Sequence, residues 1–402
     1  MTIRLIEADI PPAVLEVVKG LKDAGHRAFL VGGCVRDLLR AQVPKDFDVA
    51  TSARPDAVQK LFRRVIPTGI EHGTVTVVQR GAHVEVTTFR AEANYVDGRR
   101  PSRVDFHEDI DADLARRDFT MNAMAWDPVS HLLVDPFGGQ EDLKARVVRC
   151  VRDPLERFFE DGLRPLRAVR FATVLDFTVD PATEAAIGAT LSVFRKVAPE
   201  RVHQEFVKLL VAPHAPMGLE LLARTGLLEE FLPEALGSDF VAVGKAPKEE
   251  VPRLAVLLSH RLDARELVLR LRFPNRVAED VAHLLKHQEL PAPTTDDAGL
   301  RRWLSRVEAR HALTLFEVAR ARGLEPAGVR ARVEALLASR PPLTTKALAL
   351  DGKALMAALG VGPSPVVGQA SRYLLDVVLE DPSKNTPEGL AAALKAWKPA
   401  GA

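Results

Sequence analysis

The chain has 402 residues, of which 47% are apolar and only 5% are aromatic. A chain of this length is expected to form about two to four structural units, with cores built mainly from Leu, Val and Ala. Its formal net charge of +1 neither favours nor excludes a nucleic-acid partner, because a local basic face matters more than the sum of the charges.

The N-terminal residues and the cysteines indicate a cellular compartment. The first residues, MTIRLIEADI, lack the apolar run of a signal peptide, and no window approaches the roughly 18 uninterrupted apolar residues of a membrane span. Cys34 and Cys150 lie in predicted regular elements without metal-ligand spacing, which suits a reducing environment. We therefore expect a cytoplasmic protein with no membrane span.

The predicted elements divide the chain into a mixed first part and a helical second part. Residues 27–135 contain the strand-like runs AFLVGG, DFDVAT, TVTVVQ, HVEVTTF, MNAMAW and HLLVD, with turns and short helices between them. From about residue 145 onward nearly every segment has helical periodicity, as in RVHQEFVKLLV. The expected fold class is an α+β head, with a small mixed β-sheet and helices, followed by an all-α remainder.

Two glycines separate the first predicted strand from a short helix. Gly32 and Gly33 follow AFLV and precede a helix that begins near Cys34. Glycine lets backbone N–H groups approach a phosphate, and the N-terminal end of a helix favours negative charge. Arg36, in the first turn, can reach the same anion. The pattern is neither a Walker loop nor the GxGxxG of a dinucleotide fold, so it indicates a phosphate site only together with other residues.

Two aspartates follow in KDFDVAT. If this run is a strand, Asp46 and Asp48 lie on one face, while Phe47 and Val49 face the core. Adjacent like charges are costly unless a cation lies between them, and Mg²⁺ typically takes one or two carboxylates together with substrate phosphates. The alternative is a solvated strand end. A phosphate cradle beside a metal dyad fits a nucleoside triphosphate bound with Mg²⁺.

A third acid, Glu85, shares a predicted strand face with His83 and Thr87, while Val84 and Val86 face the core. Such a carboxylate would complete a two-metal catalytic site. The alternative is an exposed strand face that carries one acid.

The segment EDGLRPLRAVRF carries a charged residue at every third position. Asp161, Arg164, Arg167 and Arg170 would lie along one slowly rotating helix face, and Glu160 beside them is expected to brace an arginine. A solvated, self-paired face is the usual interpretation of such a stripe.

The motifs GGCVRD, DFDVATSA, EVTTFR, RRDFTMNAMA, DPFGG and EDGLRPLRAVRFA, in this order, resemble those of class II nucleotidyltransferases. That family comprises the CCA-adding tRNA nucleotidyltransferases and the bacterial poly(A) polymerases. The resemblance covers about residues 27–210. It implies a nucleotidyltransferase head over residues 1–145, a helical neck for base recognition over 146–215, a helical body over 216–340 and a tRNA-binding helical tail over 341–402.

The resemblance also implies roles for single residues. Asp46 and Asp48 match the catalytic, metal-binding aspartates, and Asp118 and Asn122 lie in the part associated with the ribose. From the residues alone, RRDF would instead be a surface salt-bridge cluster. The positions that match nucleotide-contacting residues are Gly33, Arg36, Arg117, Asp161, Arg164, Arg167 and Arg170.

Within this resemblance, Asp161 and Arg164 would read the edge of the base. Cytosine and adenine both present an amino donor next to an unprotonated ring nitrogen, so an aspartate accepts from one and an arginine donates to the other. Uracil and guanine would leave both contacts repulsive. The implied cofactor is Mg²⁺, in a two-metal scheme that activates the primer 3′-hydroxyl and steadies the leaving pyrophosphate.

The catalytic motifs do not decide the product. The C-terminal segment 348–386 resembles that of many CCA-adding enzymes, with Pro363-Ser364-Pro365 in place of a Pro-Gly-Pro turn, and the chain lacks a strongly basic tail. We therefore expect template-independent addition of CCA to the 3′ end of tRNA from CTP and ATP. The alternatives are a poly(A) polymerase, an enzyme that adds only CC or only A, and an RNA-binding protein with an inactive head.

One arginine series in the body is a candidate for RNA contact. Arg302, Arg306 and Arg310 are spaced i, i+4, i+8, so on one helix they would form a basic ridge that suits backbone phosphates. The alternative is a solvated face paired with Glu308 and Glu317.

A second arginine-rich stretch, YVDGRRPSRVDF, contains Arg99, Arg100 and Arg103. It falls where the family has a flexible loop that is implicated in the switch from C to A addition. The sequence does not indicate an oligomeric state.

Overall fold

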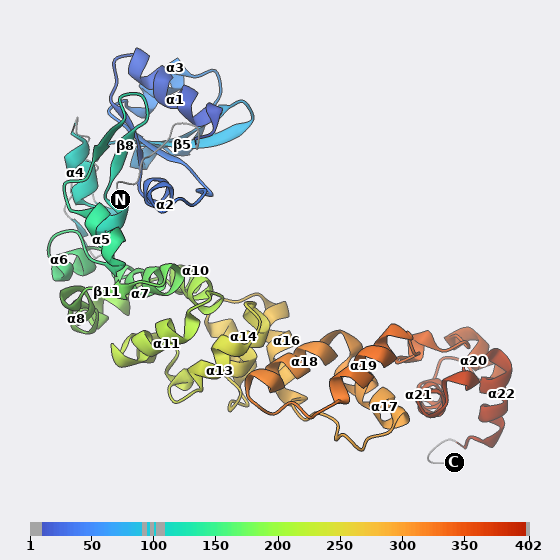
Figure 1. The fold of residues 1–402 in the computed structure, drawn as a ribbon. Coiled ribbons are helices and arrows are strands. Elements are labelled where there is room, and N and C mark those ends of the chain that lie inside the picture. The colour runs from blue at the N-terminus through green and yellow to red at the C-terminus, as the bar shows by residue number, and fades with distance from the viewer. Residues whose placement is uncertain (1–9, 91–94, 97–99, 102–108, 399–402) are drawn as a thin grey trace. The chain divides into compact units, whose positions relative to one another are not determined.

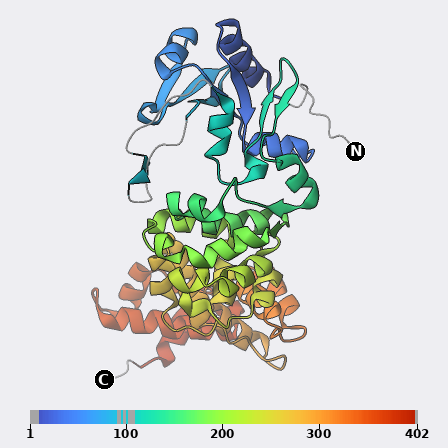
Figure 2. The same cartoon turned by 90° about the vertical axis from the view of Figure 1, so that its left-hand side faces the viewer.

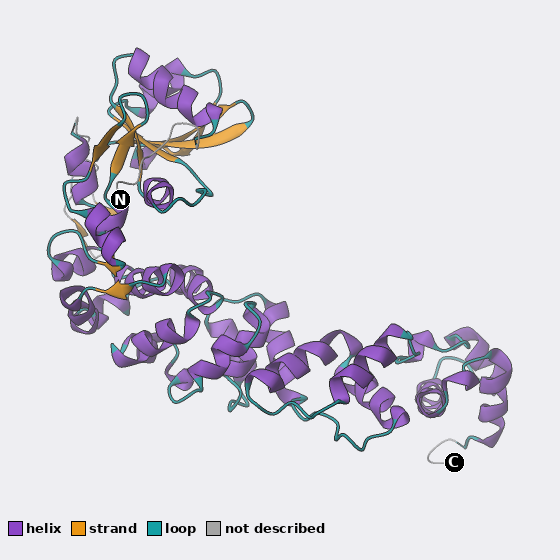
Figure 3. Ribbon diagram, viewed as in Figure 1, coloured by secondary structure: helices purple, strands orange, loops and turns teal. Residues whose placement is uncertain are grey.

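The computed structural model describes residues 10–90, 95–96, 100–101 and 109–398. It divides into two compact units, Met1–Leu236 and Gly237–Ala402. All strands of the described residues lie in the first unit, and the second unit is built from helices (Figures 1 and 3). The expected fold class, an α+β head followed by helices, is confirmed.

The first unit contains one large sheet and two very small ones. The strands of the large sheet are β1 Ala28–Val31, β2 Asp48–Thr51, β3 Val65–Gly69, β4 Thr74–Gln79, β5 Ala82–Thr88, β8 Ala125–Asp127 and β9 Leu132–Val134. These seven strands have the order β3-β4-β5-β2-β1-β8-β9. Every neighbouring pair is antiparallel except β2 and β5, which run parallel.

Burial along the strands follows the sequence pattern. In β5, Val84 and Val86 are buried while His83 and Glu85 are exposed, as predicted. Strand β1 is central and is buried at every position, which agrees with its uninterrupted apolar run. Strand β3 was not among the predicted strands, because it lies at the edge of the sheet, is mostly exposed and contains a proline.

Helices cover both faces of this sheet. Helices α1 Pro12–Asp23 and α3 Pro55–Leu61 pack on one face, and α2 Gly33–Leu39 lies on the other (Figures 1 and 2). Helix α1 buries Val14, Val17, Val18 and Leu21, the spacing of a helix with one apolar face. The side of the sheet next to α2 is left for polar residues, Asp48 at the start of β2 and Glu85 within β5.

Two short elements depart from the predicted strands. The 3₁₀ helix η3 Thr120–Asn122 takes in the first two residues of the expected strand MNAMAW, and β8 begins only at Ala125. The hairpin β6 Tyr95–Val96 and β7 Arg100–Pro101 is described by its backbone pairing. The rest of the arginine-rich loop prediction, including Arg99 and Arg103, lies outside the described residues.

The remainder of the first unit is mainly helical. Its helices are α4 Ile110–Ala115, α5 Gly139–Ala145, α6 Pro154–Glu160, α7 Arg164–Leu175, α8 Pro181–Ala189, α9 Leu191–Phe194, α10 Pro199–Leu210, α11 Ala215–Arg224 and α12 Leu227–Phe231. Helix α7 is buried along nearly its whole length. Helix α11 approaches it closely at Gly218, where an added Cβ would lie 2.1 Å from Thr173 Oγ1. The parallel strands β10 Val147–Val148 and β11 Thr178–Val179 are too short to give a periodic signal and were not predicted.

The second unit consists of helices alone among its described residues. They are α13 Phe240–Lys245, α14 Glu250–Leu257, α15 Ala264–Arg270, α16 Asn275–Lys286, α17 Asp297–Val307, α18 Ala309–Ala321, α19 Val329–Ala338, α20 Gly352–Leu359, α21 Pro365–Glu380 and α22 Pro387–Ala396, with short 3₁₀ turns. The last three helices enclose a small core of their own, formed by Leu348, Leu355, Ala370, Leu374, Val378 and Leu390. Within the described ranges, no helix is long and apolar enough to cross a membrane.

Candidate active site

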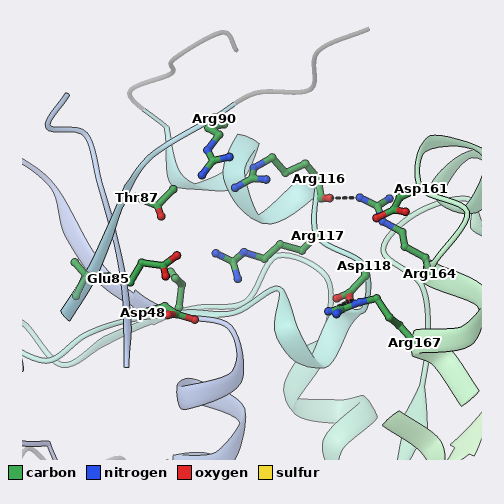
Figure 4. A pocket seen from close by; sticks show the side chains of 12 residues that line it. Asp48, Glu85, Thr87, Arg90, Arg116, Arg117, Asp118, Asp161, Arg164 and Arg167 are labelled. Atoms are coloured by element: carbon green, nitrogen blue, oxygen red, sulfur yellow. Dashed lines mark hydrogen bonds and ion pairs between the residues drawn. The ribbon is translucent and has the colours of Figure 1, made fainter. Parts of the chain in front are cut away.

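Parallel pairing of β2 with β5 places two carboxylates side by side. Asp48, the first residue of β2, is in register with Glu85 of β5, and both side chains are exposed. Residues in register on neighbouring strands share a face, so both acids line the same pocket (Figure 4). Asp46 precedes the strand, because pairing with β1 begins at Asp48. The prediction that one strand presents both aspartates is therefore wrong, and Phe47 between them is only half-buried.

The surroundings of Asp48 and Glu85 disfavour the ionised form of both carboxylates. Although Asp48 keeps solvent-accessible surface, the walls of the cavity partly desolvate its carboxylate and raise its pKa; Arg117 opposes this, and the charge of Asp46 raises the pKa further. The pKa of Glu85 is raised by burial and then by Asp48, with a smaller opposing effect of Arg90. Ionised acids that are crowded in this way are stabilised by a cation placed among them.

The donor set fits a hard divalent cation that arrives with a phosphate-bearing ligand. Such ions typically take one or two carboxylates and fill their remaining positions with phosphate oxygens and water. In the part of the chain that the structure describes, no group of three or more His, Cys, Asp or Glu side chains is arranged to hold a metal ion. The catalytic role of Glu85 beside Asp46 and Asp48 stays a prediction.

The glycine turn after β1 leaves room for an arginine side chain next to its backbone. Gly32 has a φ of 76°, a conformation that L side chains rarely adopt. An added Cβ at Gly32 would lie 2.7 Å from Arg117 Nη1, whereas at Gly33 the nearest atom would be 3.6 Å away. Gly32 is therefore the position that requires glycine, chiefly because of its backbone angles, and its missing Cβ also leaves room for the guanidinium of Arg117.

Arg36 is fixed by three neighbours in α2 and beyond. Its Nε and Nη2 donate to the two carboxylate oxygens of Asp37 at 2.9 and 3.0 Å, and its Nη1 donates to Asn122 Oδ1 at 2.8 Å. The guanidinium carbon lies 5.4 Å from the ring centre of Phe171. Arg36 thus holds the glycine turn against η3 and α7.

Asp113 of α4 gathers three arginines around one buried acid. It is 1% exposed. One carboxylate oxygen accepts from Arg116 Nε and Nη2 at 3.0 and 2.8 Å, and the other accepts from Arg117 Nη2 at 3.1 Å. The backbone N–H of Arg90 also donates to it, at 3.3 Å. The spacing i, i+3, i+4 allows the helical pairs.

This arginine group carries more positive charge than Asp113 neutralises. Burial, followed by the charge of Arg116, lowers the pKa of Arg90 to about 10. The Nε atoms of Arg90 and Arg117 are buried and have no hydrogen-bond partner among the described residues. These donors and charges are available to an anion.

A cavity of about 350 Å³ lies between the acids and the arginines. In Figure 4, Asp48 and Glu85 lie at one end, Arg117 points toward them, and Asp161 and Arg164 lie at the far end. Its lining residues are Val31, Asp48, Val49, Glu85, Thr87, Arg90, Arg116, Arg117, Asp118, Asp161, Arg164 and Arg167. The cavity therefore joins a cation-binding end to an end that carries one acid and one arginine.

Arg164 begins α7 and is 8% exposed. Its Nη1 donates to the carbonyl oxygen of Arg157 at 3.0 Å and to Glu160 at 2.7 Å, and its Nη2 donates to the carbonyl oxygen of Arg116 at 2.9 Å. The prediction that Glu160 braces an arginine is confirmed. Three of the five N–H groups of the guanidinium are used in this way, so two remain for a ligand.

Asp161 lies beside Arg164 but not on its helix. It has extended backbone angles at the end of α6. Its Oδ1 accepts from Leu163 N at 3.0 Å and its Oδ2 accepts from Arg201 Nη2 at 2.7 Å. The predicted four-residue helical stripe is therefore wrong at its first member, since α7 starts only at Arg164. Each carboxylate oxygen retains a further lone pair for an amino group.

The other two arginines of the stripe are held by acids. Arg167 Nε and Nη2 donate to Asp118 Oδ2 at 2.9 and 2.7 Å. Burial raises the pKa of Asp118, but the charge and hydrogen bonds of Arg167 outweigh it and lower this pKa to about 2. Arg170 Nε donates to Glu205 at 2.7 Å, and its guanidinium lies 3.4 Å from the ring centre of Phe171. Arg170 is buried in this pairing.

The structure brings together part of the predicted site. The predicted residues that line the cavity are Asp48, Glu85, Arg117, Asp161, Arg164 and Arg167. The predicted residues that are not among the lining residues are Asp46, Gly33, Arg36 and Arg170.

The sequence reasoning missed Arg90, Asp113 and Arg116. Arg90 is the last residue of the EVTTFR motif and follows β5. In DADLARRD, Asp113 precedes Arg116 by three residues and Arg117 by four, which places the three side chains on the same face of a helix. Those two signals could have identified them.

The basic ridge predicted in the second unit is not a ridge on one helix. Helix α17 ends at Val307, and α18 begins at Ala309, because Glu308 has a φ of 58° that interrupts the helix. Arg302 pairs with Glu380, and Arg310 Nε lies 3.1 Å from Glu308. Glu308 is a pairing partner, as the alternative reading expected.

Comparison with known proteins places the chain in a family. The family model "Poly A polymerase head domain" matches residues 28–149, and "Probable RNA and SrmB- binding site of polymerase A" matches residues 176–236. The CCA-adding enzyme of Lactobacillus helveticus (strain DPC 4571) is 34% identical to this chain, over 97% of the chain and 99% of that protein. The chain belongs to the CCA-adding enzyme family. The CCA-adding enzyme of Geobacillus stearothermophilus is 36% identical over 94% of the chain and 95% of its own length.

A solved member of the CCA-adding enzyme family has the same fold. The crystal structure of the Bacillus stearothermophilus CCA-adding enzyme in complex with CTP superposes with a TM-score of 0.83, at 32% identity, over 96% of this chain and 98% of that one. The predicted family and its CCA-adding branch are confirmed, and the chain is a tRNA nucleotidyltransferase. Nucleotidyltransferases of this family use divalent metal ions.

Proposed function

We propose that the protein adds the sequence CCA to the 3′ end of tRNA from CTP and ATP, without a nucleic-acid template. The observation that carries this proposal is the cavity with Asp48 and Glu85 at one end and Asp161 with Arg164 at the other (Figure 4). A nucleoside triphosphate matches both ends of the cavity. Its phosphates bind the cation that the two acids would hold, and the edge of its base pairs with one acceptor and one donor. The related B. stearothermophilus enzyme binds CTP, which supports CTP as a substrate.

The proposed cofactor is Mg²⁺, held by Asp46 and Asp48. The ion supplies charge at the reacting phosphate and lowers the pKa of a bound hydroxyl. The protein supplies the two hard ligands, and it disfavours a bare Asp48 anion, which favours a cation there. Glu85, in register with Asp48, is proposed as a further carboxylate that increases the negative potential at this end.

The proposed triphosphate contacts are Gly33, Arg36 and Arg117. The buried Nε of Arg117, which has no hydrogen-bond partner among the described residues, supports a direct contact to phosphate. Arg167, held by Asp118, is proposed to orient the nucleotide. Because Arg170 is paired with Glu205 and buried, we propose that it positions α7.

Asp161 and Arg164 are the proposed readers of the base. Asp161 accepts from the amino group of cytosine or adenine, and a remaining N–H of Arg164 donates to the adjacent ring nitrogen. The hydrogen bond from Arg164 to the carbonyl oxygen of Arg116 fixes the position of the guanidinium in the cavity. Uracil and guanine present a carbonyl and a ring N–H in these places and are rejected because both contacts become repulsive.

Replacement of Asp161 tests the base-reading proposal. In Asp161→Ala, the preference for CTP over UTP is expected to fall by at least about tenfold, while the affinity for Mg²⁺ is kept. Glu156→Ala, an exposed acid on α6, is the matched control. Single-turnover incorporation of each nucleotide measures the preference, and an unchanged preference in Asp161→Ala would refute the assignment.

Primer extension tests the product. A tRNA transcript without its 3′ CCA is incubated with Mg²⁺ and CTP, ATP or both, and the products are resolved at single-nucleotide length. Addition of two C residues and then one A supports the proposal. Stalling after CC, growth only on tRNA that already ends in CC, or an open-ended ladder with ATP alone would each assign a different product. No extension at all would indicate an RNA-binding protein with an inactive head.

We also propose that this activity is cytoplasmic. Both cysteines are free and buried, as suits a reducing compartment.

A further inference from the structure

A stack of three histidines lies in the second unit. The ring centres of His283 and His287, both on or next to α16, are 4.6 Å apart, and those of His283 and His311 of α18 are 4.5 Å apart. His283 is thus the middle ring. His311 is buried, whereas His283 and His287 are half-buried.

The proton on His283 is placed by the end of α17. Its Nε2 lies 2.7 Å from the carbonyl oxygen of Val307, the last residue of that helix. A carbonyl oxygen only accepts, so Nε2 of His283 carries a hydrogen.

Positive side chains surround the stack. Lys286 and Arg306 are exposed, and among the described residues neither has an ion-pair partner. Arg310 lies 3.1 Å from Glu308 and 3.7 Å from Asp280. Two acids therefore face these three cations as well as the histidines.

The acids are already shared with other groups. Asp280 also lies 3.7 Å from Arg276 on its own helix and 3.4 Å from His311 Nε2. From α15, Arg265 lies 3.9 Å from Glu279 of α16. Asp280 and Glu308 are thus already paired with other groups, and among the described residues neither forms an ion pair with Lys286 or Arg306.

The neighbours of His287 keep its ring uncharged. Burial lowers the pKa of His287, and the charges of His283, Lys286 and Arg306 lower it further, against an opposing effect of Glu308. A ring in this setting is neutral near pH 7, and it is an anion that would favour its protonation.

His311 is held neutral by the same kind of environment. Burial lowers its pKa, followed by the charges of His283 and Arg310, while Asp280 and Glu308 oppose them. The whole cluster thus has more cationic and protonatable groups than acids, gathered from α16, α17 and α18.

We propose that this cluster binds a backbone phosphate of tRNA and takes up a proton as it does so. The phosphate-binding cluster is defined as His283, Lys286, His287, Arg306 and Arg310. A phosphate supplies the negative charge that the cluster lacks, and exposed cations spread over three helices suit the accessible backbone of a nucleic acid. The inference rests on the proposed function, since it takes tRNA as the polymer.

Two properties of tRNA binding follow. The affinity increases as the pH falls from 7.5 toward 5.8, because the bound phosphate raises the pKa of the imidazoles and binding takes up a proton. The affinity also falls with salt, and each phosphate contact contributes about one to the slope of log K against log[salt].

The test is equilibrium binding of the full-length protein to a tRNA transcript without its 3′ CCA. Affinity is measured at pH 5.8, 6.5 and 7.5 at constant ionic strength, and at several salt concentrations. Arg306→Gln is expected to weaken binding about 3- to 10-fold and to reduce the salt slope by about one. His287→Gln is expected to remove most of the gain at low pH.

Matched controls separate these effects from a general loss of charge or of a histidine. Arg330→Gln removes an arginine that pairs with Glu334 in the same unit, and His214→Gln removes a half-exposed histidine of the first unit. Both are expected to keep the salt slope and the pH dependence of the wild type. If His287→Gln unfolds on heating earlier than wild type, Arg306→Gln alone decides through its salt slope.

Failure of this inference differs from failure of the proposed function. If the wild type extends tRNA but Arg306→Gln and His287→Gln match their controls in salt slope and pH dependence, the phosphate-binding cluster is refuted and the enzyme activity stands. If the wild type neither binds nor extends tRNA, the proposed function and the inference both fail.

Discussion

Two requirements on Asp48 oppose each other. Its charge is needed for a cation, yet burial and the charge of Asp46 raise its pKa. An acid whose pKa is higher in the folded than in the unfolded state makes the folded protein bind more protons, so the free energy of unfolding falls as pH rises through the interval between the two values. Above that interval, at pH 7, the metal-free protein therefore carries the whole penalty.

Asp48→Asn is expected to stabilise the metal-free protein and to abolish its activity. Without the charge, the unfolding temperature at pH 7 rises above that of the wild type. The difference shrinks as the pH falls and disappears below the pKa of the unfolded state, because the wild-type carboxyl is then protonated in both states. Incorporation of CTP falls at least about a hundredfold, because a ligand of the reacting cation is lost. Thermal unfolding at several pH values, with and without Mg²⁺ and CTP, measures the first effect, and single-turnover incorporation of CTP measures the second.

The control for this prediction is Asp56→Asn, an exposed acid in the first turn of α3. It should neither gain stability nor lose activity. An Asp48→Asn protein that Mg²⁺ and CTP stabilise as much as the wild type would contradict the proposed metal site.

The residues that the sequence identified differ in kind from those it missed. Glu85 could be assigned to the exposed face because strand alternation fixes which side chains point outward, and the structure agrees. Its register opposite Asp48 could not be predicted, since nothing in either segment specifies a parallel pair. The contact of Arg90 with Asp113 spans 23 residues, and a single sequence does not contain it, whereas the pairing of Asp113 with Arg116 and Arg117 is local and could have been predicted from their spacing.

At the scale of elements, the short helix α4 supports both ends of the cavity. Through Asp113 it holds the side chains of Arg116 and Arg117, and through the carbonyl oxygen of Arg116 it holds Arg164. A movement of its C-terminal end would therefore change the phosphate contacts and the base contacts together.

Asp113→Asn is expected to reduce kcat/KM for CTP about 10- to 100-fold by releasing both arginines. An amide cannot accept from two guanidinium groups as a carboxylate does, and charge-assisted hydrogen bonds are the stronger kind. The same change is expected to lower the free energy of unfolding by about 1–3 kcal/mol, because a buried acceptor is lost. Steady-state kinetics with CTP and denaturant unfolding measure the two effects.

Asp111→Asn is the matched control, since this exposed acid lies on the same helix. A positioning role predicts that Asp113→Asn raises KM for CTP while the affinity for tRNA is unchanged. If both affinities fall together, or if the loss vanishes at low temperature, the residue is only structural.

Element boundaries explain the remaining errors of the sequence analysis. The run RRWLSRVEARHALTLFEVARAR has no proline or glycine, so nothing in it predicts the positive φ of Glu308 that separates α17 from α18. Likewise α7 begins at Arg164 because Asp161 adopts extended angles after α6. Helices with continuous periodicity were correctly expected, but tertiary contacts decide where they end.

At the scale of the whole molecule, the nucleotide cavity and the proposed RNA-binding tail belong to different compact units. Every residue that lines the nucleotide cavity belongs to the first unit. The last three helices of the second unit have a small core of their own, so they can lose stability without a change in the first unit. Changes in that core should therefore affect RNA binding without altering nucleotide binding.

Leu374→Ala in α21 tests this separation. Leu374 is 0% exposed in the core of the last three helices, and loss of a buried leucine side chain costs about 2–5 kcal/mol. We expect the C-terminal helices to unfold at a lower temperature and the affinity for tRNA to fall at least about threefold, while the dissociation constant for CTP is unchanged. Asp376→Ala, at an exposed position of the same helix, should change none of these quantities. A Leu374→Ala protein that loses CTP binding in proportion to tRNA binding would mean that the two units fold as one, and the tail could then not be treated as an independent RNA-binding part.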